Sequence, residues 1–100
     1  GLLGASYEDG VLQVELEIQR DPGDVLLDDL QLYCVDEDGQ ELTLPPFKGS
    51  CQERYWTLHF DLSADWYDNL QYVELRLLNP DGTQDGFLLL LYMGDGALAG

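Results

Sequence analysis

The most constraining feature of the sequence is a strict period-two alternation close to its beginning. Positions 12, 14, 16 and 18 are aliphatic, and positions 13, 15, 17 and 19 are polar. Successive side chains of a β-strand point to opposite faces, so this pattern predicts a strand with one buried face and one solvated face. A helix would spread the same apolar residues around its circumference instead. The predicted inward residues are Leu12, Val14, Leu16 and Ile18.

The same kind of pattern recurs along the chain, separated by residues that favour turns. Combinations of Asp, Asn, Pro and Gly occur at residues 21–24, 36–39 and 79–82, where they supply the backbone angles that tight turns need. No segment keeps a helical period, and residues 63–69 are expected to hold a single helical turn. The further predicted strands cover residues 30–35, 41–44, 56–62, 72–77 and 87–93.

Short strands with turn signals between them predict an all-β fold. We expect an antiparallel two-sheet sandwich of about six or seven strands. A length of 100 residues suits one domain with one core. The expected organisation is an N-terminal tail at residues 1–10, the sandwich at residues 11–93 and a C-terminal tail or linker at residues 94–100, all cut from a longer protein.

The order of these predicted elements resembles that of an immunoglobulin-like or fibronectin-III-like domain over roughly residues 11–93. The shared order is an alternating strand, a hairpin pair, a strand led by Trp56, a short corner and a closing hairpin. The resemblance implies a non-catalytic adhesive, spacer or sensory module that is extracellular or at the cell surface. The acidic bias of the chain suits a bacterial surface protein.

The charge balance limits the partners of such a module. The chain has 20 Asp and Glu against 4 Lys and Arg, a formal net charge of -16 and a pI near 4.1. Repulsion from phosphate groups makes nucleic acid and anionic membranes poor partners. No apolar run reaches the 18 residues of a membrane-spanning helix, so direct membrane insertion is not expected. The expected partner is a protein or a neighbouring domain of the same polypeptide.

The cysteines and carboxylates do not form a recognisable metal or cofactor site. Cys34 and Cys51 have no CxxC spacing, and the chain contains one histidine, which argues against zinc. The two thiols either form a disulfide, which would favour export, or remain one buried and one exposed thiol. The Asp residues in the loops are interpreted chiefly as ordinary turn residues, with a specific calcium site as the less favoured alternative. Weak, nonspecific stabilisation by calcium is expected from the charge density. No cofactor is expected.

The two outer faces of the predicted sandwich differ in character. Pairing of the first alternating strand with the Trp56 strand exposes a polar set: Gln13, Glu15, Glu17, Gln19, Thr57, His59 and Asp61. The opposite sheet exposes an apolar, tyrosine-rich set, which is typical of an interface. The predicted partner-binding residues of this second face are Tyr33, Val35, Tyr72, Arg76, Leu88, Leu90 and Tyr92.

Two other interpretations of this face stay open. Leu2 and Leu3, or an edge strand built from the N-terminal tail, could cover it within the same chain. Arg76 could either bind an acidic partner group or form a local ion pair with Glu74, and the local pair is favoured.

A second functional hypothesis is a carbohydrate-binding module attached to a polysaccharide-acting enzyme. Trp66 and Tyr67 lie in a polar corner, where aromatic rings could stack on sugars. The competing interpretation is that Trp66 plugs the end of the sandwich. Enzymatic activity is not expected, because His59 and Asp61 have no nucleophile in a recognisable motif.

Overall fold

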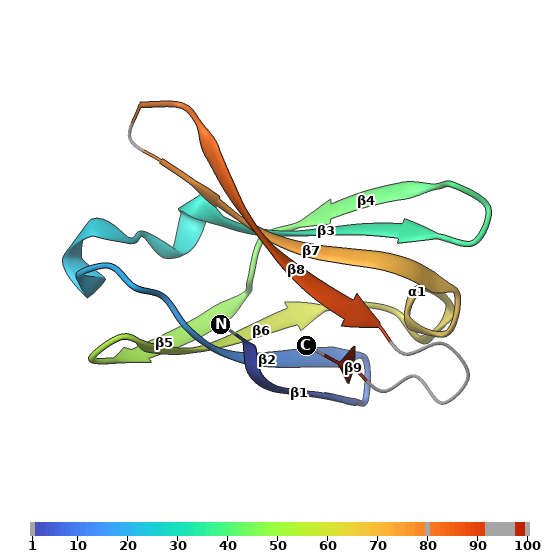
Figure 1. Cartoon of the computed structure of the whole chain (residues 1–100). Helices are drawn as coiled ribbons and strands as arrows, with labels where there is room; N and C mark the ends of the chain where they lie inside the picture. Colours follow the sequence, from blue (N-terminus) through green and yellow to red (C-terminus); the bar gives the residue numbers. More distant parts are fainter. Residues whose placement is uncertain (1, 80, 92–97, 100) are drawn as a thin grey trace.

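The protein is a sandwich of two antiparallel sheets (Figure 1). The computed structural model describes residues 2–79, 81–91 and 98–99, with side chains at residues 3–21, 23–79 and 81–83. Sheet A has the strand order β1-β2-β6-β5, and sheet B has the order β4-β3-β7-β8-β9. The predicted antiparallel two-sheet fold is therefore confirmed. Sheet A contains β1 (Leu2–Glu8), β2 (Val11–Glu17), β5 (Lys48–Gln52) and β6 (Tyr55–Asp61); sheet B contains β3 (Leu30–Asp36), β4 (Glu41–Leu44), β7 (Leu70–Leu78), β8 (Gln84–Leu91) and β9 (Leu98–Ala99).

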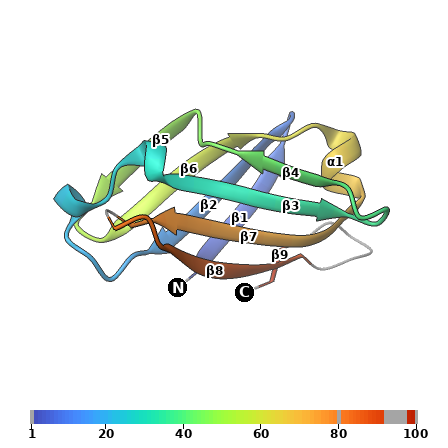
Figure 2. The same ribbon diagram turned by 90° about the horizontal axis from the view of Figure 1, so that it is seen from above.

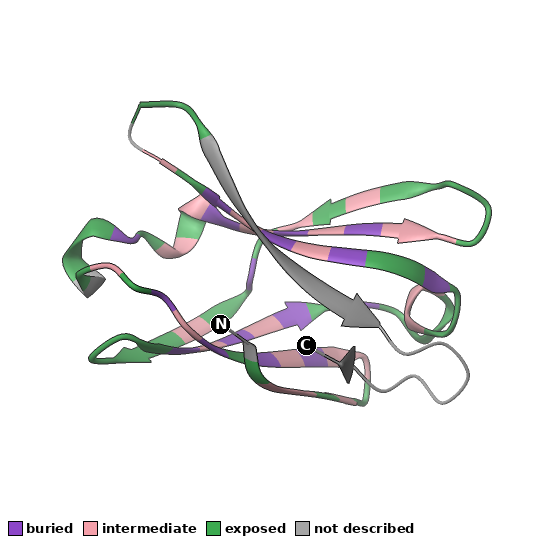
Figure 3. Cartoon of the chain, in the orientation of Figure 1, coloured by how far each residue is buried: buried purple, intermediate pink, exposed green. Residues whose placement is uncertain are grey.

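The core lies between the inner faces of the two sheets. Buried and more exposed residues alternate along the strands, as Figure 3 shows. Full burial of one large aliphatic or aromatic side chain stabilises a fold by about 1.5–3 kcal/mol, so these faces hold the sheets together. All four residues predicted to face inward on the first strand are buried. The central core residues are Leu12, Val14, Leu16, Leu32, Leu58, Phe60, Val73 and Leu75.

The strand pairing follows the sequence prediction. Val14 of β2 lies opposite Leu58 of β6, and Leu32 of β3 lies opposite Leu75 of β7. The hairpin partner β4 borders β3, and β8 borders β7. Seen from above, sheet B lies over sheet A (Figure 2). The two outer faces therefore belong to different sheets, as the alternation indicated.

Three strands occur where the sequence predicts tails or a loop. Residues 2–8, assigned to the N-terminal tail, form β1 and pair with β2, with Tyr7 opposite Leu12. Residues 48–52, expected to be a loop, form β5 at the other edge of sheet A. Both are edge strands, held by backbone hydrogen bonds to a single neighbour. Within the predicted C-terminal tail, residues 98–99 form β9 against β8, whereas residues 94–97 and 100 lie outside the described residues.

The loop between the sheets contains short helical turns. Two 3-10 turns, η1 (Pro22–Asp24) and η2 (Leu27–Asp29), connect β2 to β3. The predicted corner turn is α1 (Ala64–Asp68), and the Ser63 side chain caps it by accepting a hydrogen bond from the backbone N–H of Trp66 at 3.3 Å. This corner places Trp66 and Tyr67 at one end of the sandwich.

The two cysteines are separate free thiols. Cys34 is buried on β3 of sheet B, and Cys51 is exposed on β5 of sheet A. Of the two alternatives left by the sequence, the structure has one buried and one exposed thiol. Burial raises the pKa of the Cys34 thiol to about 12, which keeps it protonated.

Candidate functional site

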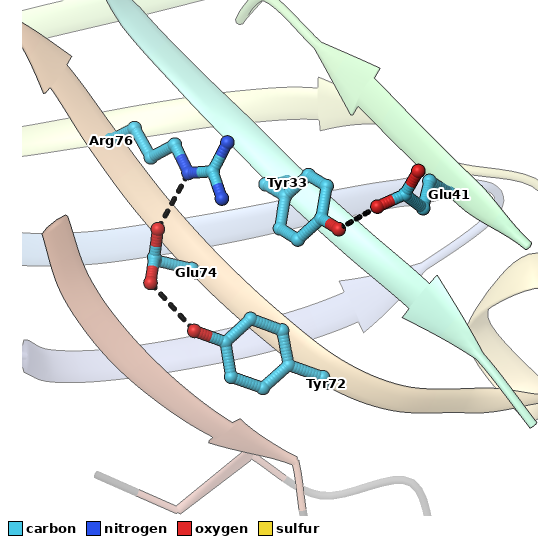
Figure 4. A network of polar contacts seen from close by, with 5 residues as sticks. All are labelled: Tyr33, Glu41, Tyr72, Glu74 and Arg76. Carbon is cyan, nitrogen blue, oxygen red and sulfur yellow. Dashed lines mark hydrogen bonds and ion pairs between the residues drawn. The ribbon is translucent and has the colours of Figure 1, made fainter. Parts of the chain in front are cut away.

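The outer face of sheet B carries a cluster of aromatic and charged side chains. Tyr33 of β3 lies opposite Glu74 of β7, and Val35 lies opposite Tyr72. Because paired residues share a face, the two central strands place these side chains together on the side away from the core. Figure 4 shows the resulting group, here named the tyrosine cluster. Its members are Tyr33, Glu41, Tyr72, Glu74 and Arg76.

Glu74 is the centre of the hydrogen bonding in this cluster. The Tyr72 hydroxyl donates to Glu74 Oε2 at 2.6 Å, and Arg76 Nε donates to Glu74 Oε1 at 2.6 Å. Both carboxylate oxygens are thus engaged. The local ion pair favoured for Arg76 is present. On the neighbouring strand, the Tyr33 hydroxyl donates to Glu41 of β4.

Ring contacts connect the two hydrogen-bonded halves. The guanidinium carbon of Arg76 lies 4.0 Å from the centroid of the Tyr33 ring, which is cation–π geometry. The rings of Tyr33 and Tyr72 meet edge to face, with centroids 6.1 Å apart and planes at 71°. Each aromatic ring is therefore fixed by both a hydroxyl contact and a ring contact, so the cluster is organised before any partner binds.

These contacts set the ionisation of the cluster. The Tyr72 hydroxyl and then the Arg76 guanidinium lower the pKa of Glu74 below its ordinary value. Hydrogen bonding to the Glu41 carboxylate raises the pKa of Tyr33, and hydrogen bonding to Glu74 raises that of Tyr72. At neutral pH the cluster therefore combines neutral phenols with an ionised Glu74–Arg76 pair.

The described part of this face is more polar than the sequence suggested. Tyr72 is 36% exposed, while Tyr33, Val35 and Arg76 are half-buried.

The sequence analysis did not include Glu41, because its position beside Tyr33 depends on the β3–β4 register rather than on any local pattern. Leu88 of β8 lies opposite Glu74 in the register, and Leu90 of β8 lies opposite Ala99 of β9, but Tyr92 lies outside the described residues.

The N-terminal segment does not cover this face. Strand β1 belongs to sheet A, where it forms the edge next to β2. Leu3 on that strand is 59% exposed. The interpretation in which Leu2 and Leu3 shield the tyrosine face from within the chain is therefore wrong.

The outer face of sheet A contains the single histidine. His59 on β6 is half-buried beside Phe47, with ring centroids 6.0 Å apart. Its neighbours across the register are Gln13 of β2 and Lys48 of β5. This arrangement brings no hydroxyl or thiol nucleophile into register with the imidazole.

The two aromatic residues of the corner, Trp66 and Tyr67, make different contacts. Tyr67 stacks on Tyr7 and packs against the core. Trp66 also packs against the core, and it lines a pocket of about 300 Å³, here named the corner pocket. Of the two residues predicted for carbohydrate binding, Trp66 lines the corner pocket, and Tyr67 is not among the residues that line it. The residues lining the corner pocket are Asp36, Gln40, Asp65, Trp66 and Asn69.

A larger pocket of about 640 Å³ lies at the loop between β2 and β3. Arg20 stands at its edge and donates a hydrogen bond to the side chain of Asn79 in the β7–β8 connection. Leu26 in this loop is 62% exposed. The residues lining this pocket are Arg20, Asp21, Gly23, Asp24, Leu26 and Asp29.

The loop carboxylates have structural roles wherever their hydrogen bonds are described. Asp36 Oδ1 accepts from the backbone N–H groups of Asp38 at 2.9 Å and Gln40 at 2.8 Å. Asp81 Oδ1 accepts from the Thr83 backbone N–H at 2.9 Å and from its hydroxyl at 2.6 Å. These are turn contacts. Across the part of the chain that the structure describes, no group of three or more His, Cys, Asp or Glu side chains could hold a metal ion.

Comparison of the chain with protein-family models, curated proteins and solved structures found no match. Among the described residues, no helix is long and apolar enough to cross a membrane. The class that the fold defines is a two-sheet antiparallel β-sandwich, and its candidate sites are the tyrosine cluster and the corner pocket.

Proposed function

We propose that the protein is a non-catalytic interaction module of a larger exported protein, with an immunoglobulin-like role as an adhesive, spacer or sensory domain. The tyrosine cluster is its docking surface. A neighbouring domain or a separate protein, extracellular or at the cell surface, is the partner. The single observation that carries this proposal is the fixed arrangement of Tyr33, Tyr72 and Arg76 on an outer sheet face.

The chemistry of the cluster supports this proposal. Tyrosine and arginine are among the residue types enriched at energetically important positions of protein interfaces. Both tyrosine rings and the guanidinium are already held by contacts within the chain, so binding would cost little additional side-chain entropy. Such preorganisation favours a docking surface.

The charge of the chain favours a basic partner. A formal net charge of -16 repels a second copy of the same chain and attracts a surface rich in Lys and Arg. Within the cluster, the carboxylates of Glu41 and Glu74 add negative charge to the surface that carries Tyr33 and Tyr72.

Site-specific photo-crosslinking in cells that produce the protein tests which face is used. A photoreactive residue at Thr43, which is exposed on β4 and paired with Tyr33, is expected to give a specific crosslinked product. The matched control is the same residue at Gln52, which is exposed on β5 of the opposite sheet.

Competition makes this experiment specific. An excess of the purified wild-type chain should suppress the Thr43 product, whereas a chain carrying Tyr72→Ser and Arg76→Ser should not. Equal yields of crosslinked product from Thr43 and Gln52 would contradict the proposal. Equal suppression of the Thr43 product by the wild-type and the doubly substituted chain would also contradict it.

A further inference from the structure

We propose that the corner pocket binds a single neutral hexopyranose residue of a glycan. The pocket lies at the α1 end of the sandwich, where the turn between β3 and β4 meets the corner helix (Figure 1). This binding site is separate from the function proposed for the tyrosine cluster, because the two involve different side chains.

One hydrogen bond between the two walls and one within each wall hold the pocket in shape. The backbone N–H of Glu37, in the β3–β4 turn, donates to the Asn69 carbonyl oxygen at 2.9 Å. Within the turn, the Asp36 N–H donates to the Gln40 carbonyl oxygen at 3.0 Å. On the helix side, Asn69 Nδ2 donates to the Asp65 carbonyl oxygen at 2.8 Å. The lining residues are therefore placed before a ligand arrives.

The lining combines the two kinds of group that a sugar ring requires. A pyranose has apolar C–H faces and a rim of hydroxyls, each of which both donates and accepts. Trp66, which is partly buried and packs against the core, provides an aromatic residue in the pocket lining. The amides of Gln40 and Asn69 and the carboxylates of Asp36 and Asp65 provide donors and acceptors around it.

Gln40 has the most available hydrogen-bonding capacity of these groups. Its side chain is exposed, and within the described part of the chain the side-chain amide makes no hydrogen bond, although the backbone N–H donates to Asp36 Oδ1. Asn69, by contrast, already uses its Nδ2 group on Asp65, which leaves Oδ1 as an acceptor. Gln40 can therefore both donate to and accept from adjacent sugar hydroxyls.

Size and charge restrict the ligand further. A volume of about 300 Å³ lies at the lower end of the roughly 300–1,000 Å³ range of small-molecule sites, which suits one ring rather than an oligosaccharide segment. Asp36 and Asp65, together with a net charge of -16, repel uronates, sulfated sugars and phosphates. The expected ligand is therefore uncharged.

NMR titration of the ¹⁵N-labelled chain tests this assignment. The probes are the methyl glycosides of glucose, mannose, galactose and N-acetylglucosamine, with methyl glucuronide as the anionic comparison. At least one neutral glycoside should shift the signals of the Trp66 indole N–H and the Gln40 side-chain amide in a saturable manner. The indole of Trp56, buried in the core, should not move. If none of the four neutral probes shifts the Trp66 signal, the proposal is wrong.

A matched pair of variants localises the binding. Trp66→Ala would disturb core packing as well as the pocket, so the informative change is Gln40→Ala. Loss of one or two hydrogen bonds should raise the dissociation constant by about fivefold or more. Gln52→Ala, at an exposed position on β5, should leave it unchanged. Equal effects of the two variants would overturn the proposal, whatever result the crosslinking of the tyrosine cluster gives.

Discussion

The ring of Tyr7 stacks on the ring of Tyr67, with centroids 3.9 Å apart and planes at 5° to each other. The Tyr7 hydroxyl also donates a hydrogen bond to the carbonyl oxygen of Leu62 at 2.6 Å. Tyr7 lies on β1, Leu62 lies just before the corner, and Tyr67 lies within α1. The first strand is therefore fastened to the corner by both an aromatic and a polar contact.

The first prediction concerns the polar half of this link. Tyr7→Phe keeps the aromatic ring and removes the hydroxyl that satisfies the Leu62 carbonyl group. The free energy of unfolding should fall by about 1 kcal/mol, the usual contribution of such a hydrogen bond. Urea denaturation measures the change.

The control for Tyr7→Phe is Tyr55→Phe, because Tyr55 is 50% exposed on β6. A surface change of this kind should alter the free energy of unfolding by less than about 0.5 kcal/mol. If Tyr7→Phe destabilises the protein no more than Tyr55→Phe does, the hydroxyl contact does not stabilise the fold.

The contrast between β2 and β1 shows how much of the fold the sequence predicts. Strand β2 buries one face completely, so a period-two pattern is required and can be recognised. Strand β1 has a register irregularity between Leu2 and Gly4 and an exposed Leu3, which removes the alternation. Strand β5, with the sequence KGSCQ, is an edge strand with little buried surface. Such strands depend on backbone hydrogen bonds, for which no side-chain pattern is needed.

The candidate sites also contain some residues that a periodic pattern places and others that it does not. Tyr33, Tyr72 and Arg76 could be placed on one outer face because parity along two strands decides it. The contact of Glu41 with Tyr33 depends on the β3–β4 register. The gathering of Asp36 and Gln40 beside Trp66 depends on a turn meeting a helix. These contacts join residues that are distant in sequence or close to a turn, so periodicity alone does not reveal them.

A second prediction concerns close packing at Gly49 on β5. A Cβ atom at this position would lie 2.4 Å from Leu27 Cδ1 and 3.1 Å from Leu58 Cδ2. Gly49→Ala should therefore lower the free energy of unfolding by about 1 kcal/mol, because the flexible end of Leu27 must move. The measurement is thermal or urea unfolding.

The control for this prediction is Gly23→Ala, since nothing lies within 4 Å of a Cβ atom there. The smaller entropy of the unfolded alanine chain should leave stability equal or slightly higher. Equal destabilisation by both changes would show that Leu27 does not confine Gly49.

A third prediction follows from the lowered pKa of Glu74. A carboxyl group whose pKa is lower in the folded state stabilises the fold above its unfolded pKa, about 4.3. This contribution is lost as the pH falls through the folded pKa. Glu74→Gln should therefore cost about 0.5–1 kcal/mol at pH 7, a range typical of partly exposed ion pairs, and much less at the acid end.

Glu8→Gln provides the charge-matched control, because it also removes one negative charge from an exposed position, on β1 of sheet A. Urea unfolding of the wild type and both variants across the acid range separates the two effects. A difference between the wild type and Glu74→Gln that stays constant with pH would contradict a role for the ionised carboxylate.

The last prediction distinguishes the two thiols by their reactivity. A pKa of about 12 leaves about one Cys34 side chain in ten thousand as thiolate at pH 8, and burial also blocks access. Cys51 is exposed, although partial desolvation raises its pKa and its Sγ donates to the Glu53 carbonyl oxygen at 3.2 Å. Iodoacetamide should therefore alkylate the native chain once, at Cys51, and twice in denaturant, as mass spectrometry can measure.

Cys51→Ser separates this interpretation from a disulfide. While folded, the variant should be labelled only as slowly as the core around Cys34 opens. In denaturant it should rapidly take up one label. A native wild-type chain that remains unlabelled until a reductant is added would show that the thiols are joined. Because Cys34 is buried and Cys51 is exposed as separate free thiols in the structure, such a result would contradict the placement of one of them.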